Sequence, residues 1–371
     1  MMGDNLVRYF FDMVNIDSES GKEQEFLKYL ENLFQRELDS QTDYDSYGNL
    51  IIRIKGKNST QNEPLLFCCH ADTVKPGKGI EPVLDKGIIR SKGDTILGAD
   101  DKAGIAEILV ALQKASQYPP IELVITREEE VGLSGSSFLD TSLLKAKKGY
   151  VIDSESLEEI IIGGPSRVEM VIKIIGKAAH AVEPEHGISA IEVAAHAISL
   201  LKTGWIDPIT TLNIGLIEGG QVLNAVPEDT IVQLECRSQK HNRCLEQSRL
   251  IKNTFQTVAK ARGARLEIES KLGVKAYQIS ENAEVVEVAK KAIQSIGAKP
   301  VTRVICGGTD AANLNEKGIT TAVLGTGGKL PHSKDENIAI ADMKKNSKHY
   351  YKHFKRVFLK YFEDCVCLYL C

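Results

Sequence analysis

Four short apolar segments in the first half of the chain constrain its fold more than any other feature. They read NLIIRI, PLLFCC, IELVIT and GYVID, and PLLFCC is almost continuously apolar. Segments of this length predict strands, and continuous apolarity is typical of strands buried inside a sheet. Between two of them, Ile105, Ile108, Leu109 and Leu112 have the spacing of a helix. Strands that alternate with helices predict an α/β domain.

The pattern changes after the GGP at residues 163–165. The following segment, RVEMVIKIIG, alternates apolar and polar residues, which predicts a strand with one buried face. Further patterns predict a helix, two strands, a helix and a strand, which is the order of a ferredoxin-like α+β unit. A chain of 371 residues is long enough for two cores. The simplest architecture is an α/β domain of residues 1–163 and 275–371, interrupted by an inserted domain of residues 164–274.

Local patterns near the two ends of the chain predict helices. Ser20 and Glu23 match a capping box, which would open a helix at that point. Near the carboxyl end, an apolar stripe from Tyr350 to Tyr361 predicts a terminal helix. The cysteine-rich tail EDCVCLYLC that follows is assigned no function.

Charge and composition exclude several classes of function. The net charge of -4 and the pI near 6.1 predict no partner among nucleic acids or anionic membranes. No run of about 18 apolar residues predicts a membrane span, and the amino-terminal residues lack the pattern of a signal peptide. The eight cysteines include no CxxC pair. They therefore favour reduced thiols in a cytoplasmic protein over a disulfide framework or a thiolate zinc site.

Acidic residues and a histidine follow the predicted strands of the first domain. His70 and Asp72 come after PLLFCC, and the EEE of residues 128–130 comes after IELVIT. Asp153 ends GYVID, and Asp100 precedes a helix. Ligands of open α/β sheets collect at the carboxyl ends of strands. Carboxylates that converge there repel one another, and a divalent metal with nitrogen and oxygen ligands, such as zinc, manganese or cobalt, would relieve the repulsion.

Each of these residues has a plainer interpretation when it is taken alone. An aspartate at a strand end is usually a cap or turn residue, and the acidic run at residues 128–130 could be a solvated turn. His70 could be an interior histidine that is hydrogen-bonded. The combination of four such motifs at strand ends and a helix start favours the metal site.

Five motifs in one order carry a resemblance to a known family. CCHADT, GADDKAG, EEEVG, VID and PHSKDEN resemble the signature of the peptidase T, glutamate carboxypeptidase and aminoacylase family of di-zinc metallopeptidases. HADT and LGADDKAGIAEI resemble the peptidase T-like branch. The resemblance covers almost the whole chain. It implies an α/β catalytic domain with a mixed, mostly parallel sheet flanked by helices, and an inserted ferredoxin-like lid and dimerisation domain.

The resemblance also implies a role for each matching residue. Glu129 matches the general base, and Asp72 matches the aspartate that orients the imidazole of His70. Asp100 matches a carboxylate that bridges two divalent ions, most readily zinc, with cobalt or manganese as alternatives. A hydroxide shared by the ions would attack the amide bond. The implied metal ligands are His70, Asp100, Glu130, Asp153 and His332.

Residues outside these motifs have implied roles in binding substrate. His180 in GKAAHA matches a histidine that stabilises the oxyanion, often across a dimer, although alone it suggests a surface loop. Asn224 and Arg237 match substrate contacts, and an arginine suits a carboxylate. Arg237 could instead form a structural ion pair. Gly327 and Gly328 in GTGG predict a loop that lets the backbone approach the substrate.

The adjacent Asp100 and Asp101 are expected to have different roles. Asp101 is expected to turn toward the start of the following helix, where its charge is favourable. Lys102 is expected to add local charge balance. The resemblance implies a cis peptide between the two aspartates.

Three functions are compatible with these observations. The first is a di-metal exopeptidase for short peptides, acting as a tripeptidase or aminopeptidase like peptidase T. The second is an N-acyl amino acid amidohydrolase or carboxypeptidase on the same scaffold. The third is a non-catalytic metal-binding protein, which would need the ligands but not an unliganded base such as Glu129. The expected partners are a short peptide or N-acyl amino acid and a second copy of the chain.

Overall fold

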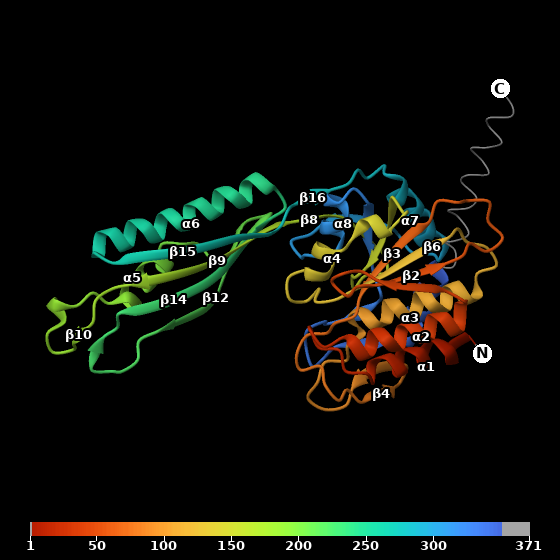
Figure 1. Ribbon diagram of the computed structural model, residues 1–371, viewed down its shortest axis with the longest axis horizontal. Coiled ribbons are helices and arrows are strands. Elements are labelled where there is room, and N and C mark those ends of the chain that lie inside the picture. Colours follow the sequence, from red (N-terminus) through yellow and green to blue (C-terminus); the bar gives the residue numbers. More distant parts are fainter. Residues whose placement is uncertain (1, 351–371) are drawn as a thin grey trace, which may run out of the picture. The chain divides into compact units, whose positions relative to one another are not determined.

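A computed structural model describes residues 2–350 of the protein, and a mixed nine-stranded sheet dominates the described chain (Figure 1). Its central strands are parallel: β3 pairs with β6 and β7, and β7 pairs with β18. Antiparallel strands extend it on both sides. The mixed, mostly parallel sheet that the family resemblance implies is thus confirmed. In spatial order the strands are β1 (Gln41–Tyr44), β2 (Leu50–Ile54), β6 (Ile121–Thr126), β3 (Leu65–His70), β7 (Lys148–Ile152), β18 (Thr320–Leu324), β8 (Glu159–Gly164) and β16 (Tyr277–Gln278), with β17 (Val301–Val304) beside β8.

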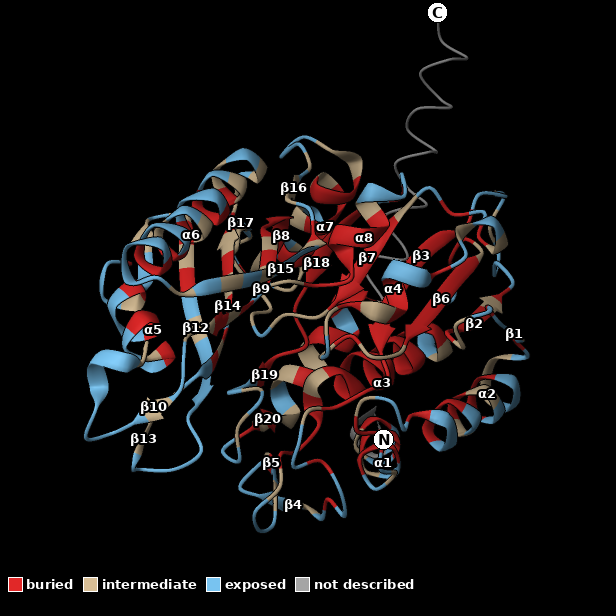
Figure 2. Ribbon diagram, turned by 60° about the vertical axis from the view of Figure 1, so that its left-hand side comes forward, coloured by how far each residue is buried: buried red, intermediate tan, exposed pale blue. Residues whose placement is uncertain are grey.

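Burial explains why the central strands read as continuous apolar runs. Every residue of β3 and β6 is buried, and Figure 2 shows both strands as buried along their lengths. A strand covered on both faces has no solvent-facing side on which polar residues are favourable. PLLFCC and IELVIT are therefore strands of the interior, as the sequence predicts.

Helices flank this sheet. Figure 1 shows α1, α2 and α3 stacked side by side, and α3 packs against β3. The helix α7 contacts β7 and β18, and α8 contacts α4 and β18. The bounds are α1 (Met2–Val14), α2 (Gln24–Leu38), α3 (Ala99–Lys114), α4 (Ser134–Phe138), α7 (Glu284–Ser295) and α8 (Ala311–Glu316). A small antiparallel sheet, which the sequence patterns did not predict, contains β4 (Pro82–Asp85), β5 (Ile88–Ser91), β19 (Gly328–Lys329) and β20 (Asn337–Ala339).

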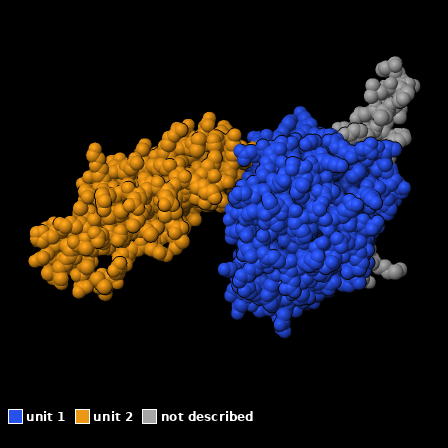
Figure 3. Space-filling model, in the orientation of Figure 1, with its two compact units in different colours: residues 1–162, 278–303, 309–371 blue, residues 163–277, 304–308 orange. Residues whose placement is uncertain are grey.

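The chain forms two compact units (Figure 3). Unit 1 comprises the chain up to Ile162, Gln278–Arg303 and the chain from Thr309 onward, and unit 2 comprises Gly163–Tyr277 and Val304–Gly308. Unit 1 holds the large sheet and the helices described above.

Unit 2 is built on an antiparallel sheet of ferredoxin-like order. Its strands run β11-β12-β14-β9-β15, and the helices α5 and α6 follow β9 and β14 along the chain. The apolar residues of β9 and β14 pack against both helices, around Ile172, Val232 and Phe255. The bounds are β9 (Ser166–Ile175), β10 (Ala179–His180), α5 (Ala190–Ser199), β11 (Gly204–Asp207), β12 (Thr210–Gly219), β13 (Ala225–Val226), β14 (Asp229–Ser238), α6 (His241–Arg262) and β15 (Arg265–Val274).

The predicted capping box is wrong. The N-cap of α2 is Glu23, whose side chain makes no cap hydrogen bond. One of its oxygens instead accepts from the Gly21 N–H at 2.7 Å, and the other accepts from the guanidinium of Arg127. The Ser20 hydroxyl donates to Asp72 at 2.7 Å. Ser20 is thus hydrogen-bonded to Asp72, and Glu23 to Gly21 and Arg127, instead of capping each other's backbone.

Other expectations concern the termini and the thiols. No helix among residues 2–350 has the length and apolar character that crossing a membrane requires. Cys68, Cys69, Cys236, Cys244 and Cys306 are free thiols, as expected. The chain is helical over residues 340–350, and the rest of the predicted terminal stripe and the cysteine-rich tail lie outside the described residues.

Candidate metal centre

His70 is the last residue of β3, and its ring is held on both nitrogens. The Nδ1 lies 2.9 Å from the backbone carbonyl of Asp72, to which it can donate. The Nε2 lies 3.1 Å from Oδ1 of Asp100. Only 2% of His70 is exposed. A histidine that donates from Nδ1 to a fixed acceptor presents Nε2 as a metal ligand, which is the usual arrangement around bound ions.

The carboxylate of Asp72 fixes the acidic loop that follows β6. Its Oδ1 accepts from the Glu129 N–H at 2.9 Å, and its Oδ2 accepts from the Glu130 N–H at 3.2 Å. The Ser20 hydroxyl also donates to Oδ2, and no part of Asp72 is exposed. Oδ1 of Asp72 also lies 3.6 Å from Nδ1 of His70. A single buried anion therefore positions the histidine and both glutamates.

Asp100 lies between two imidazoles. Its Oδ1 faces His70, and its Oδ2 is 3.6 Å from Nε2 of His332. The Asp100–Asp101 peptide is cis, which confirms the expectation. His332 also approaches Oε1 of Glu130, at 2.9 Å. Asp100 thus contacts both halves of the cluster.

Asp101 lies in the first turn of α3, as expected, whereas the contacts of Lys102 differ from expectation. Asp101 is fully buried, and its Oδ2 accepts from the His70 backbone N–H at 3.3 Å rather than capping α3. Lys102 is also buried and donates to the carbonyl of Ile16 at 2.7 Å. Burial lowers the pKa of Lys102 to about 7. The lysine therefore anchors the chain before α2 to α3, instead of balancing the aspartates.

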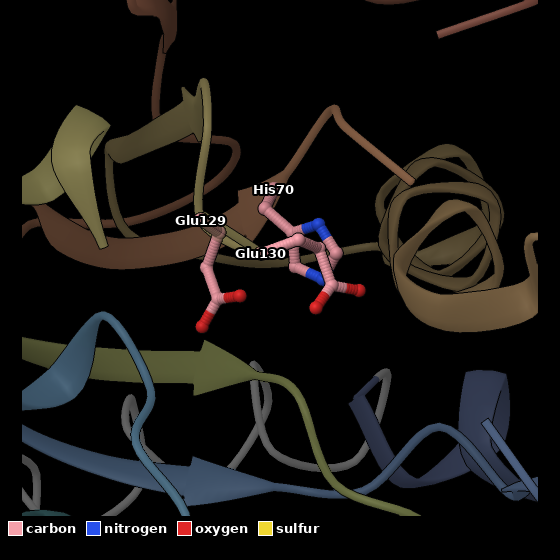
Figure 4. Close-up of side chains that lie close together, drawn as sticks. All are labelled: His70, Glu129 and Glu130. Atoms are coloured by element: carbon pink, nitrogen blue, oxygen red, sulfur yellow. The ribbon is translucent and has the colours of Figure 1, made fainter. Parts of the chain in front are cut away.

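Three overlapping groups of side chains could each hold a cation. Within each group, the candidate ligand atoms lie within 4.8 Å of one another. Figure 4 shows the carboxylates of Glu129 and Glu130 extending to the same side as the ring of His70. Asp153 joins from the residue after β7. The groups are His70 with Glu129 and Glu130, His70 with Asp100 and Asp153, and Asp100 with Glu130 and His332.

The histidines and Asp100 stabilise one another's charged forms. Burial alone would lower the pKa of His70, but its contacts with Asp100 and Asp72 outweigh burial and raise that pKa well above its usual value. Contacts with Asp100 and Glu130 raise the pKa of His332 to about 10. Burial opposes ionisation of Asp100, yet the two imidazoles hold its pKa below the usual range. Positive charge is favourable at this position.

The other carboxylates oppose ionisation. Burial raises the pKa of Glu129 well above its usual value, and repulsion from Asp310 and Glu130 adds to the effect. Desolvation and repulsion from Glu129 and Asp100 likewise raise the pKa of Asp153. A set of crowded oxygen ligands and two imidazole nitrogens matches divalent cations, which compensate the repulsion. The donor set thus fits the divalent metal that the sequence predicts.

The remaining predicted residues lie elsewhere. Gly327 has a φ of 85°, and Gly328 opens β19 in unit 1. His180, Asn224 and Arg237 belong to unit 2, on or beside β10, β13 and β14. The guanidinium of Arg237 pairs with Glu235 at 2.8 Å. These three residues are therefore in a different compact unit from the metal cluster.

A family model, described as Peptidase family M20/M25/M40, matches residues 66–356. The chain belongs to this family. It is a hydrolase of the peptidase class, and its family and its ligand cluster together support the use of divalent metal. The match includes all five candidate metal ligands and Glu129.

The M20 chain is similar to a curated relative and to two solved structures over nearly its whole length. It is 37% identical to the uncharacterized protein YqjE of Bacillus subtilis, over 92% of this chain and 95% of the relative. The structure of the aminopeptidase PepT from Bacillus cereus is 35% identical with a TM-score of 0.86, covering 96% of this chain and 100% of that one. A tripeptidase structure from Staphylococcus aureus is 33% identical with a TM-score of 0.88, covering 96% and 98%.

Sequence reasoning missed two buried acids of this M20 peptidase. Asp310 is 1% exposed and accepts from the Thr126 hydroxyl at 2.5 Å, and burial raises its pKa. Glu336 is 2% exposed and accepts from backbone N–H groups beside Asp100. Glu336 lies within the quoted motif PHSKDEN, whereas Asp310 lies outside the quoted motifs. Their partners are so distant along the chain that no local spacing indicates them.

Proposed function

We propose that this M20 peptidase is a di-metal exopeptidase that hydrolyses short peptides from a free amino end, as a tripeptidase or aminopeptidase does. The observation that carries the proposal is the convergence of His70, Asp100 and Glu130 with Glu129 in overlapping groups. The names of the similar structures, an aminopeptidase and a tripeptidase, support the substrate class.

Two of the overlapping groups support the ligand sets that we propose. His70 and Asp153 would hold one ion, Glu130 and His332 would hold the other, and Asp100 would contact both. Bound divalent ions, for which we propose zinc with cobalt or manganese as alternatives, polarise a carbonyl and lower the pKa of water.

Glu129 is the proposed general base. It is 8% exposed, and its backbone is fixed by Asp72. In this role it accepts a proton from the attacking water and donates it to the departing amine. A carboxyl whose pKa is raised by burial is suited to both steps, since it binds and releases a proton closer to neutral pH. Its closeness to the proposed ligands His70 and Glu130, with candidate ligand atoms within 4.8 Å of one another, supports the assignment.

The residues outside the cluster have proposed roles in binding. His180 would stabilise the oxyanion, and Asn224 and Arg237 would bind the substrate, together with the backbone at Gly327 and Gly328. We further propose a homodimer that forms through unit 2 of a cytoplasmic protein. Sedimentation velocity tests the dimer, and a monomer at micromolar concentration would contradict it.

A second activity, that of an N-acyl amino acid amidohydrolase or carboxypeptidase, has one supporting observation. Arg237 offers a guanidinium of the kind that binds a carboxylate in a bidentate manner. The Nε and Nη2 groups of Arg237 already donate to Glu235, at 2.8 and 3.1 Å, which weakens the case for bidentate binding of a carboxylate.

A hydrolysis screen separates the two activities. Di- and tripeptides with free amino ends, the same peptides acylated at that end, and N-acyl amino acids are each incubated with the zinc, cobalt and manganese forms. The proposal predicts cleavage of the free peptides and a large loss of rate on acylation. Equal rates on the acylated peptides would support the second activity instead.

A further inference from the structure

The start of α3 has no capping side chain from its own neighbourhood. The N-cap is Gly98, which adopts a φ of 71° and contributes no side chain. The first N–H groups of a helix have no partner within the helix and require an acceptor. These N–H groups belong to the backbone directly beside Asp100. The group that accepts their hydrogen bonds therefore also affects the position of the Asp100 carboxylate.

Glu336 supplies the acceptor from a distant part of the chain. Its Oε2 accepts from the N–H groups of Leu97 and Gly98, both at 2.8 Å, and its Oε1 accepts from the Asp100 N–H at 3.1 Å. The side chain is 2% exposed. Successive N–H groups at a helix start form a favourable site for an anion. Three charge-assisted hydrogen bonds thus fix the backbone on both sides of Ala99.

His332 lies on the same short segment of the chain as Glu336. Glu336 follows it by four residues, and the Glu336 N–H donates to the carbonyl of Ser333 at 3.1 Å. The segment then enters β20, which pairs with β5. This tight turn connects His332 to Glu336. The hydrogen bonds of Glu336 to the start of α3 therefore also constrain the distance between His332 and Asp100. That distance is 3.6 Å between Nε2 and Oδ2.

We propose that Glu336 is a positioning residue for the metal centre, which fixes Asp100 and His332 relative to each other so that both reach the same ion. The proposal rests on the proposed two-metal function. A carboxylate that only capped α3 would stabilise the fold and leave metal affinity unchanged. Metal binding therefore distinguishes the positioning role from a merely structural one.

The variant Glu336→Gln keeps the shape of the side chain but places an amide N–H₂ against one of the backbone donors. Loss of a residue that orients metal ligands typically lowers metal affinity about 10–100-fold. Competition between the variant and a chromophoric chelator for zinc measures the affinity. The cobalt form provides a second readout, because its visible absorption changes when the ligand geometry is disturbed.

The chain offers a matched control in Glu122. This side chain is 3% exposed and also accepts from backbone N–H groups, those of Lys145 and Ala146 at 2.9–3.0 Å. It lies near the start of β6, whereas the metal cluster lies beyond the end of that strand. Glu122→Gln should lower thermal stability to a similar extent while leaving the zinc affinity and the cobalt spectrum as in wild type.

Equal zinc affinities in wild type, Glu336→Gln and Glu122→Gln would overturn the proposal. If Glu336→Gln does not fold, amide hydrogen exchange in the metal-free wild type tests the proposal instead. The proposal predicts strong protection of the Leu97, Gly98 and Asp100 amides without metal, and exchange as fast as in an exposed loop would contradict it. None of these readouts uses peptide hydrolysis. A chain that binds zinc but cleaves no peptide would therefore contradict the proposed function and leave the Glu336 comparison intact.

Discussion

At the scale of single residues, buried titratable groups couple the fold to pH. His349 is 1% exposed, and its ring stacks on Tyr350 with centroids 5.4 Å apart. Burial lowers its pKa from the usual 6.5 to about 4. The unfolded chain therefore binds a proton at His349 at a higher pH than the folded chain does.

This difference predicts a loss of stability in acid. Well above pH 6.5 the histidine is neutral in both the folded and the unfolded chain, so its protonation does not change the free energy of unfolding. As the pH falls from 6.5 to about 4, the unfolded state gains the proton first, and the free energy of unfolding falls by roughly 3 kcal/mol. In His349→Phe this contribution is absent. Urea unfolding of the metal-free chain, followed by circular dichroism across this pH range, measures the difference. Parallel pH profiles for variant and wild type would contradict the prediction.

At the scale of elements, the close pairing of β3 and β7 depends on a glycine. Gly149 lies opposite Leu66 in the parallel ladder. A Cβ at Gly149 would stand 2.2 Å from the Leu66 carbonyl oxygen and 2.4 Å from its Cβ, so the strands would have to separate. Gly149→Ala should therefore lower the free energy of unfolding by about 1–3 kcal/mol.

A second strand glycine provides the control. In β12, a Cβ at Gly215 would meet nothing closer than 3.7 Å, so Gly215→Ala should be neutral or slightly stabilising. Thermal unfolding of both variants tests the pair. Equal shifts of the melting temperature in the two variants would contradict the prediction, because the close contact with Leu66 would then not explain the need for glycine at position 149.

Strands that are buried on one face or on both faces were predictable from the sequence. PLLFCC and IELVIT became β3 and β6, and RVEMVIKIIG became most of β9. Burial on both faces produces a continuous apolar run and burial on one face produces an alternating pattern, so these strands are visible in the sequence. The short strands of the small sheet are partly exposed and show no such period.

Side chains whose partners lie far along the chain were predicted less well. The capping box failed because Ser20 and Glu23 are bound by Asp72 and Arg127. Glu336 escaped notice because its partners lie 236 or more residues away. Four of the five candidate ligands were identified because they follow a strand or open a helix, whereas His332 was implied only by the resemblance of PHSKDEN to the family. The sequence alone could not show that Asp72 fixes the backbone of the acidic loop.

At the scale of the whole molecule, the cluster depends on the fold of unit 1. Its side chains come from the ends of β3, β6 and β7, from the start of α3 and from the turn before β20. The proposed mechanism gives the cluster two roles: five side chains would hold the ions, and Glu129 would transfer the proton.

Glu129→Gln tests this separation most directly, with metal content and tripeptide hydrolysis measured on the same sample. Glu128→Gln is the matched control, because Glu128 accepts from the Tyr47 hydroxyl at 2.6 Å and belongs to none of the metal-binding groups. The account predicts that both variants bind two metal ions per chain. It also predicts that only Glu129→Gln loses about 10²–10⁴-fold in rate. A Glu129→Gln enzyme that retains its metal and hydrolyses the tripeptide at nearly the wild-type rate would contradict the account.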